Sequence, residues 1–308
     1  MKRLLLGFSF LISGIVSAQQ IGNSNLESWD NLGSNQEEPT NWNGFKSATG
    51  SFSGFGSQQI ERSSSIRAGA SGTYCARIWS KSTLGVMANG VMTSGRMNMG
   101  SSSLSSASNY NFSQIDDANF SEALTTAPDS LVFWAKYTAA SSEQAGAHAV
   151  IHDQYAAHDP VDAATQPYVV ADADINYSPT NGAWKRFSVP FVYTVTTGLS
   201  PKFILLTFST NHIPGGGAAN DEVLIDDVQL IYNSVSSIDE VNSPISVSVS
   251  DLEGLQLSGL APSTQIHIYE TSGQLVQEGS AAKLEGSHLK TGFYLVQIEQ
   301  KSFKIYVP

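Results

Sequence analysis

Between residues 19 and 233 the chain is built from short β-type runs, and clusters of Gly, Ser, Asn and Pro separate these runs. Such spacing is typical of antiparallel β-sandwiches. No stretch carries the apolar repeat of three to four residues that a long amphipathic helix needs. The clearest expected strands lie at 131–137, 149–151, 184–189, 203–208 and 223–232. We therefore predict an all-β sandwich for this part of the chain.

The charge balance excludes whole classes of partner. Charged residues make up 14% of the 308 residues, and the formal net charge is -11. The lysines and arginines are scattered, so no face could neutralise a phosphate backbone or an anionic membrane. Cys75 is the only cysteine, which excludes an internal disulfide and makes a poor zinc site. We predict no nucleic-acid partner and a polar, weakly charged surface of the extracellular type.

The first residues have the pattern of a targeting signal. Lys2 and Arg3 precede an apolar run at 4–16, and the residues at 16–18 are small enough for a signal peptidase to cleave after Ala18. The apolar run is 13 residues long, shorter than the roughly 20 that a membrane-spanning helix needs. We predict a signal peptide over 1–18, no transmembrane segment and a secreted or cell-surface protein.

A second, smaller pattern follows the first. Residues 234–243 are polar and end before a proline, which is typical of a linker. Beyond them, apolar residues alternate with serines along 245–249, and similar alternation recurs to the C-terminus. This period of two predicts antiparallel strands with one buried face. We expect domains at 19–233 and 244–308, the second a smaller immunoglobulin-like β-sandwich of seven strands.

The smaller domain resembles a known family, the type A sorting domain of the type IX secretion system in Bacteroidota. The resemblance rests on the segments 268–276, 289–298 and 303–307. Family members usually open with a Pro-Asn-Pro turn after the first strand, where this chain has 250–253 instead. The resemblance implies a translocation signal without chemistry of its own, which the type IX secretion machinery handles and often removes during surface attachment.

The larger domain resembles the carbohydrate metabolism domain of exported Bacteroidota proteins. The matching segments, in family-like order, are 25–29, 93–98, 133–137, 206–217 and 224–233. The resemblance implies a galactose-binding-like jelly roll with a role in carbohydrate recognition. Neither the fold nor the family establishes catalysis.

Jelly rolls of this kind often hold a structural calcium ion between an early glutamate and a carboxylate of the last strand. Glu27, Asp226 and Asp227 match that arrangement. Alternation along 223–232 also groups Asp226 with Val228 on the more apolar face, where a carboxylate has to be hydrogen-bonded, protonated or metal-bound. Calcium takes six to eight oxygens, so backbone carbonyls would complete the shell. We expect either a structural calcium ion or carboxylates that cap turns and accept backbone N–H bonds.

A glycoside hydrolase is an alternative hypothesis, since such an enzyme needs two carboxylates about 5 to 9.5 Å apart across the sugar. Candidates are Asp153, Asp159, Asp162, Asp172 and Asp174. A zinc interpretation draws on histidines of the same stretch, namely His148, His152 and His158. A strand would place the first two roughly 13 Å apart, too far for one ion. A polar loop rim is the better interpretation of these histidines.

Aromatic side chains carry the remaining functional argument, because sugars lay their apolar C–H faces on Trp or Tyr rings. In the expected strand 131–137, Phe133 and Tyr137 share one face, which leaves Trp134 and Lys136 on the other. That second face offers a platform for a glycan, unless a loop covers the Trp134 ring. We predict a carbohydrate-binding protein without catalysis, with Trp134 and Lys136 in the site. A surface adhesion protein without a small ligand is the other alternative.

Overall fold

The computed structural model describes residues 18–83, 85–140, 142–194, 198–232, 245–250, 254–298 and 301–307. Residues 1–17 of the predicted signal peptide and the predicted linker at 234–243 lie outside these ranges. The chain divides into two compact units between Asn233 and Ser234. None of the helices in the described ranges is long and apolar enough to cross a membrane.

Short strands make up most of the larger unit, which confirms the all-β prediction. Its strands are β1 (Trp29–Asp30), β2 (Glu38–Pro39), β3 (Ile60–Ser63), β4 (Cys75–Trp79), β5 (Lys81–Thr83), β6 (Val86–Ala88), β7 (Val91–Thr93), β8 (Arg96–Met99), β9 (Asn109–Phe112), β10 (Glu122–Ala123), β11 (Ser130–Thr138), β12 (Ala145–His152), β13 (His158–Asp159), β14 (Val169–Tyr177), β15 (Lys185–Pro190), β16 (Val192–Tyr193), β17 (Phe203–Ser209) and β18 (Glu222–Ile231). Two single-turn 3-10 helices, η1 (Ser53–Phe55) and η2 (Gln166–Tyr168), interrupt the loops.

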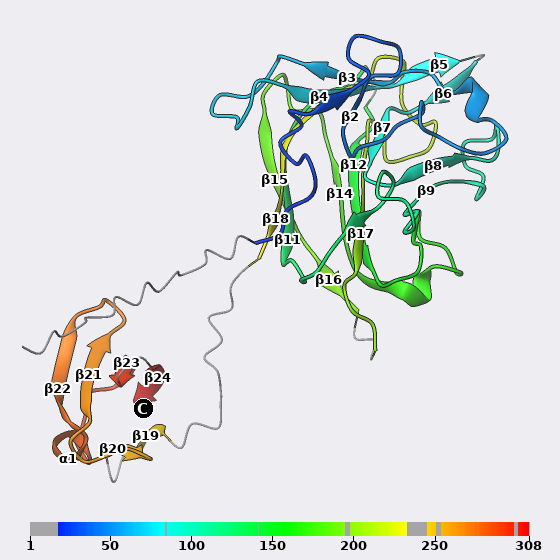
Figure 1. Cartoon of the computed structure of the whole chain (residues 1–308). Helices are drawn as coiled ribbons and strands as arrows, with labels where there is room; N and C mark the ends of the chain where they lie inside the picture. The colour runs from blue at the N-terminus through cyan, green and yellow to red at the C-terminus, as the bar shows by residue number, and fades with distance from the viewer. Residues whose placement is uncertain are drawn as a thin grey trace, which may run out of the picture. The chain divides into compact units, whose positions relative to one another are not determined.

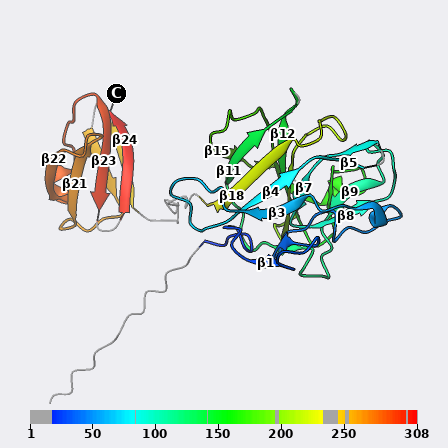
Figure 2. The same cartoon turned by 90° about the horizontal axis from the view of Figure 1, so that it is seen from above.

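Two antiparallel sheets pack face to face in this unit (Figure 1). The six-stranded sheet has the order β10-β17-β12-β14-β16, with β7 also paired to β17. The five-stranded sheet has the order β15-β11-β18-β4-β3, and Figure 2 shows its strands side by side in one layer. Phe133 of β11 joins the two sheets, because its ring centroid lies 5.1 Å from that of Phe208 on β17. The predicted jelly-roll sandwich is confirmed.

The inner face of β11 is the one that the sequence predicts. Leu131, Phe133, Ala135 and Tyr137 are all fully buried in the core between the sheets. Their neighbours along the strand therefore project from the outer face of the five-stranded sheet.

The last strand of the larger unit, β18, departs from strict alternation. Its register with β11 shifts next to Trp134, so a β-bulge adds one residue to β18. Asp227, at the bulge, has a left-handed φ of 45°. Ile225 and Val228 consequently both face the core, whereas Asp226 is the partner of Trp134 on the outer face. The predicted grouping of Asp226 with Val228 is wrong, because period-two counting cannot anticipate a bulge.

Part of the outer face of the six-stranded sheet is covered by a three-stranded sheet of order β13-β9-β8. Val150, Val169 and Leu205 form a buried cluster there with Ala157, which precedes β13. Elsewhere the outer face of β12 and β17 is polar. The covering sheet therefore ends beside an open, polar stretch of the larger one.

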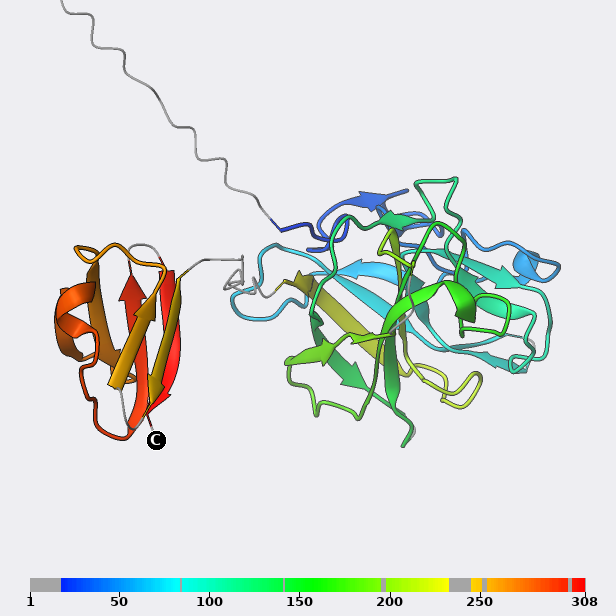
Figure 3. The same cartoon turned by 90° about the horizontal axis from the view of Figure 1, so that it is seen from below.

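The smaller unit is also a β-sandwich, as predicted. Its elements are β19 (Ser246–Ser250), β20 (Gly254–Ser258), β21 (Gln265–Glu270), β22 (Leu275–Ser280), α1 (Ala281–Leu284), β23 (Gly292–Ile298) and β24 (Lys301–Val307). A four-stranded sheet of order β22-β21-β23-β24 packs with the β19-β20 pair around its own core, and Figure 3 shows α1 flanking the strands. The described ranges hold six strands here, where the sequence predicts seven.

Candidate functional site

The polar stretch of the six-stranded sheet brings together four strands. His148 of β12 and Thr207 of β17 are register partners on the outer face. Asp159 of β13 reaches them, and its Oδ1 lies 2.8 Å from Nδ1 of His148. Asp159 also accepts hydrogen bonds from the side chains of Thr207 and Asn111, while the amide of Asn111 on β9 lies within 3.4 Å of the Thr207 hydroxyl. These four side chains fix one another's positions at the floor of a groove.

The charges of His148 and Asp159 stabilise each other. Burial alone would lower the pKa of His148, but the hydrogen bond and charge of Asp159, with the charges of Asp174 and Asp172, outweigh burial and raise it. Burial alone would raise the pKa of Asp159, but His148 and the hydroxyl and amide donors lower it. Over the range between the two pKa values, the pair is a partly buried ion pair.

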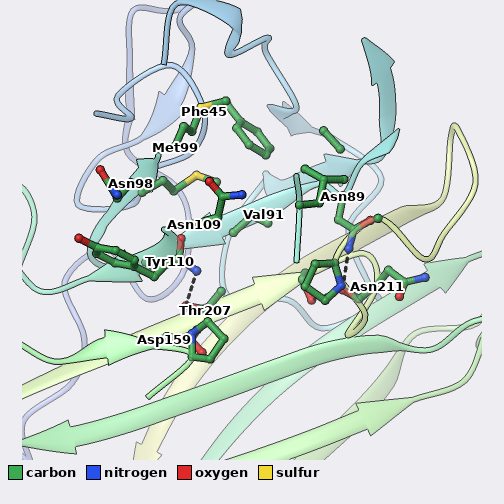
Figure 4. Close-up of a pocket in the computed structure, with 18 of the residues that line it drawn as sticks. Phe45, Asn89, Val91, Asn98, Met99, Asn109, Tyr110, Asp159, Thr207 and Asn211 are labelled. Atoms are coloured by element: carbon green, nitrogen blue, oxygen red, sulfur yellow. Dashed lines mark hydrogen bonds between the residues drawn. The ribbon is translucent and has the colours of Figure 1, made fainter. Parts of the chain in front are cut away.

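Two adjoining cavities open above this floor. The central cavity, of about 230 Å³, lies between the sheet and the β8–β9 hairpin (Figure 4). The polar cavity, of about 260 Å³, includes both His148 and Asp174. Both cavities share a boundary formed by Asp159, Thr207, Ser209 and His212. The two cavities therefore adjoin, and together they are called the groove; each part is close to the lower size limit of small-molecule sites.

The wall of the central cavity mixes amides with apolar rings. Figure 4 shows Tyr110, Asn109 and Asn98 along one side, with Asn89 and Asn211 along another. Within the described residues, Asn89 Oδ1 and Asn211 Nδ2 are buried without a hydrogen-bond partner. One is an acceptor and the other a donor, and both lie behind the surface of the cavity wall.

Sequence reasoning named His148 and Asp159 but missed their partners. Thr207 and Ser209 interrupt an otherwise apolar run at two alternate positions, which was the available signal for a polar outer face. Asn111 lies in a strand that the sequence analysis did not predict. Nothing along the sequence joins β9, β13 and β17, because their pairing is a property of the folded sheets.

Trp134 and Lys136, the predicted carbohydrate platform, lie on the outer face of the other sheet. The guanidinium carbon of Arg67 lies 4.5 Å from the centre of the Trp134 ring, so a loop residue covers part of the face on which a sugar would stack. Neither Trp134 nor Lys136 lines the central or polar cavity. The structure thus places the predicted platform away from the groove.

Glu27, Asp226 and Asp227 lie near one another at the bulge of β18. Both oxygens of Glu27 accept hydrogen bonds from the 73–74 loop, including the Tyr74 N–H at 2.7 Å. Asp227 contacts the guanidinium of Arg67 and a serine hydroxyl. Burial and, secondly, the charge of Asp227 raise the pKa of Asp226 to about 7. Its Oδ2 is buried and has no hydrogen-bond partner among the described residues.

This arrangement only partly suits a calcium ion. The free oxygen of Asp226 is the kind of ligand that calcium prefers. However, in the part of the chain that the structure describes, no three acidic, histidine or cysteine side chains converge as a metal site. As arranged, Glu27 and Asp227 are held by N–H, hydroxyl and guanidinium donors. Calcium at this position stays a prediction.

The other candidate carboxylates and histidines have separate partners. Asp153 accepts the N–H of Tyr155 at 3.0 Å, and Asp162 pairs with His158 at 2.8 Å. His152 is fully buried against a serine hydroxyl and two carbonyls. Of the five aspartates considered for hydrolysis, Asp159 and Asp174 border the polar cavity.

Comparison with known proteins identifies the smaller unit. Residues 234–306 match the model of the secretion system C-terminal sorting domain. The C-terminal region is therefore a sorting domain, as its sequence predicts. A search of curated proteins gave no significant match.

Several solved structures show remote similarity to this chain. A Bacteroides thetaiotaomicron protein described as a "putative glycoside hydrolase" is 17% identical, with a TM-score of 0.46, and 63% of each chain is covered. A Bacteroides vulgatus protein of the same description is 16% identical, with a TM-score of 0.43, covering 58% of this chain and 82% of that one. The carbohydrate-binding module TmCBM61, in complex with β-1,4-galactotriose, is 11% identical, with a TM-score of 0.28, covering 62% and 88%. Because the chain spans 63% of the first of these proteins, its function has to follow from its own residues.

We predict that millimolar calcium raises the melting temperature of the metal-free protein and that a chelator reverses the rise, since a ligand bound only to the native state stabilises it. Asp226→Asn should abolish the calcium-dependent rise in melting temperature, because it removes the negative charge of the carboxylate that carries the free oxygen. Differential scanning calorimetry of both proteins checks this. Identical wild-type melting curves with calcium and with chelator would show that calcium does not stabilise the protein.

A second prediction concerns the ion pair. Its contribution to stability should be lost as pH falls through the Asp159 pKa, below 3.8, and as pH rises through the His148 pKa, above 6.5. The difference in unfolding free energy between wild type and Asp159→Asn should therefore be largest between these limits. Urea unfolding from pH 3 to 9 measures that difference.

Proton NMR gives the control for the same prediction. The pKa of His148 should fall in Asp159→Asn, whereas His152, whose pKa burial lowers, should titrate unchanged. A wild-type His148 that titrates at or below 6.5 would contradict the ion pair.

Proposed function

We propose that the protein is an exported carbohydrate-binding protein and that a glycan binds in the groove formed by the central and polar cavities. The observation that carries the proposal is the joint presence of fixed polar groups and apolar rings in one open cleft. Sugars need both, because their hydroxyls require hydrogen bonds and their C–H faces require apolar contact. The resemblance of the larger domain to a carbohydrate metabolism domain supports the same class of ligand.

The floor of the groove is preorganised for hydroxyl recognition. The carboxylate of Asp159 is oriented by His148, Thr207 and Asn111 before any ligand arrives. A charged acceptor held in place forms stronger hydrogen bonds than a neutral one and loses less entropy on binding. The half-buried ring of Tyr110 stacks on His158 with centroids 4.0 Å apart, so it too is held in place at the cavity wall.

The chemistry of Asp159 favours hydrogen-bond acceptance over general-acid catalysis. A glycoside hydrolase needs one carboxylic acid whose pKa is raised, so that it can protonate the leaving group. The pKa of Asp159 is lowered instead, because His148 and neutral donors stabilise the charged form by more than burial destabilises it. Asp159 therefore suits a hydrogen-bond acceptor rather than a general acid. The glycoside hydrolase remains the second candidate, because Asp174 borders the same cavity.

We predict that Asp159→Asn weakens glycan binding at least tenfold, about the effect of losing one hydrogen bond to a charged group. Tyr110→Ala should also weaken binding, because it removes an apolar ring on which a sugar face can stack. A glycan array probed with the full-length chain selects the oligosaccharide, and isothermal titration calorimetry measures its affinity for each variant. Asp153→Asn is the matched control, because Asp153 accepts the N–H of Tyr155 at 3.0 Å and lines neither cavity.

Trp134→Ala tests the sequence-based platform in the same assay. If the groove is the site, this variant keeps its affinity. A stable Trp134→Ala protein that loses binding, beside a normal Asp159→Asn protein, would move the site to the outer face of the five-stranded sheet. Hydrolysis of a chromogenic glycoside that Asp174→Asn abolishes would replace binding by catalysis.

Export completes the proposal. The C-terminal sorting domain and the predicted signal peptide support passage through the inner membrane, recognition by the type IX secretion machinery, and release or attachment at the cell surface. We predict that deletion of residues 244–308 leaves the protein in the periplasm, because the deletion removes the secretion signal and leaves the larger unit intact. Immunoblots of periplasm and medium check this, with full-length protein as the control. Normal yield of the truncated chain in the medium would refute the sorting role.

A further inference from the structure

A third cavity adjoins the central cavity at the end away from Asp159. This apolar cavity, of about 260 Å³, is lined by Phe45, Phe52, Phe55, Val86, Met99 and Leu104, among others. It shares Phe45, Met99 and Leu104 with the central cavity. Figure 4 shows Phe45 and Met99 at the end of the central cavity opposite Asp159 and Thr207. The groove therefore changes from charged and polar at one end to apolar at the other.

The apolar lining is not explained by the folding core. None of the six side chains named above belongs to a buried hydrophobic cluster of the described residues. Phe55 is 56% exposed, although leaving a large apolar surface in water is unfavourable. No charged side chain of the described chain lines this cavity. These residues form an apolar surface that a ligand could cover.

Two local structures hold this surface in place. Phe52 precedes the η1 turn and Phe55 is its last residue, and the hydrogen bond from Phe55 N–H to Phe52 C=O at 3.0 Å closes the turn. Their rings lie with centroids 6.2 Å apart. The rings are therefore presented by a short rigid turn rather than by an open loop.

Leu104 supplies the second local structure. It is the single large apolar residue of the serine-rich loop between β8 and β9, and that loop is tied by Asn109 Nδ2 to Ser103 C=O at 2.7 Å. A Cβ on Gly215 would lie 2.7 Å from Leu104 Cδ1, so the leucine packs closely against the backbone there. Leu104 thus lies between the central and apolar cavities and borders both.

We propose that the groove binds a single amphipathic ligand, a sugar joined to an apolar aglycone. This inference rests on the proposed function for its sugar-binding half. The sugar lies over Asp159 and Thr207, and the aglycone lies against Phe45, Phe52 and Phe55. A purely polar oligosaccharide would leave the apolar end uncovered, and a purely apolar molecule would leave Asp159 without a ligand hydroxyl. Because the central and apolar cavities adjoin at Phe45, Met99 and Leu104, one molecule can contact both the polar and the apolar end.

The test compares methyl and n-octyl glycosides of glucose and of galactose, titrated below their micelle concentrations into the full-length chain. The octyl glycoside should bind at least tenfold more tightly than the methyl glycoside of the same sugar, about the effect of removing two methylene groups from water. Phe52→Ser/Phe55→Ser should remove this gain and leave methyl glycoside affinity unchanged. Leu32→Ser is the matched control, since Leu32 is 58% exposed and borders none of the three cavities.

The outcomes separate the two proposals. Methyl and octyl glycosides that bind equally, with binding lost in Asp159→Asn, would overturn the apolar subsite and leave glycan binding intact. Octanol that binds as tightly as octyl glycosides, with no effect of Asp159→Asn, would overturn sugar recognition in the groove. Should octyl glycosides not bind, the inference is wrong. Sedimentation that shows a dimer dependent on Phe52 and Phe55 would assign the apolar surface to a second copy of the chain instead.

Discussion

The contact between Phe133 and Phe208 is the constraint on which the rest of the larger unit depends. It fixes the inner face of β11 and the inner face of β17. Because side chains alternate along a strand, the same contact decides which residues are left on the two outer faces. His148 and Thr207 are consequently placed outside on one sheet, and Trp134 and Lys136 outside on the other.

The two outer faces then differ in how their polar groups are used. On the five-stranded sheet, arginines lie over the rings, with Arg67 over Trp134 and Arg77 over Trp79. Arg77 is in turn paired with Glu61 and with a second glutamate. Cation–π and ion-pair contacts thus occupy surfaces that a sugar would need. On the six-stranded sheet the polar groups border open cavities, which is why the groove, rather than the tryptophan face, carries the proposed function.

Partial burial strengthens the ion pair of the groove. His148 and Asp159 lie in a partly buried site, where a charge interacts more strongly than at an exposed surface. The pair holds a carboxylate in its ionised form and in one orientation, so the floor is ready to accept hydrogen bonds from ligand hydroxyls. The same stabilisation lowers the tendency of Asp159 to donate a proton, so this side chain suits a hydrogen-bond acceptor better than a general acid.

The sequence by itself determined the all-β class, the smaller C-terminal sandwich with its sorting signature, and the buried face of 131–137. These are encoded locally, in alternation, turn residues and short motifs. Tertiary structure decided the rest. The bulge at Asp227 reversed the expected side of Asp226, because one inserted residue shifts every later side chain. The groove depends on β9, β12, β13 and β17, and only the pairing of these strands brings Asn111, Asp159 and Thr207 within hydrogen-bonding distance.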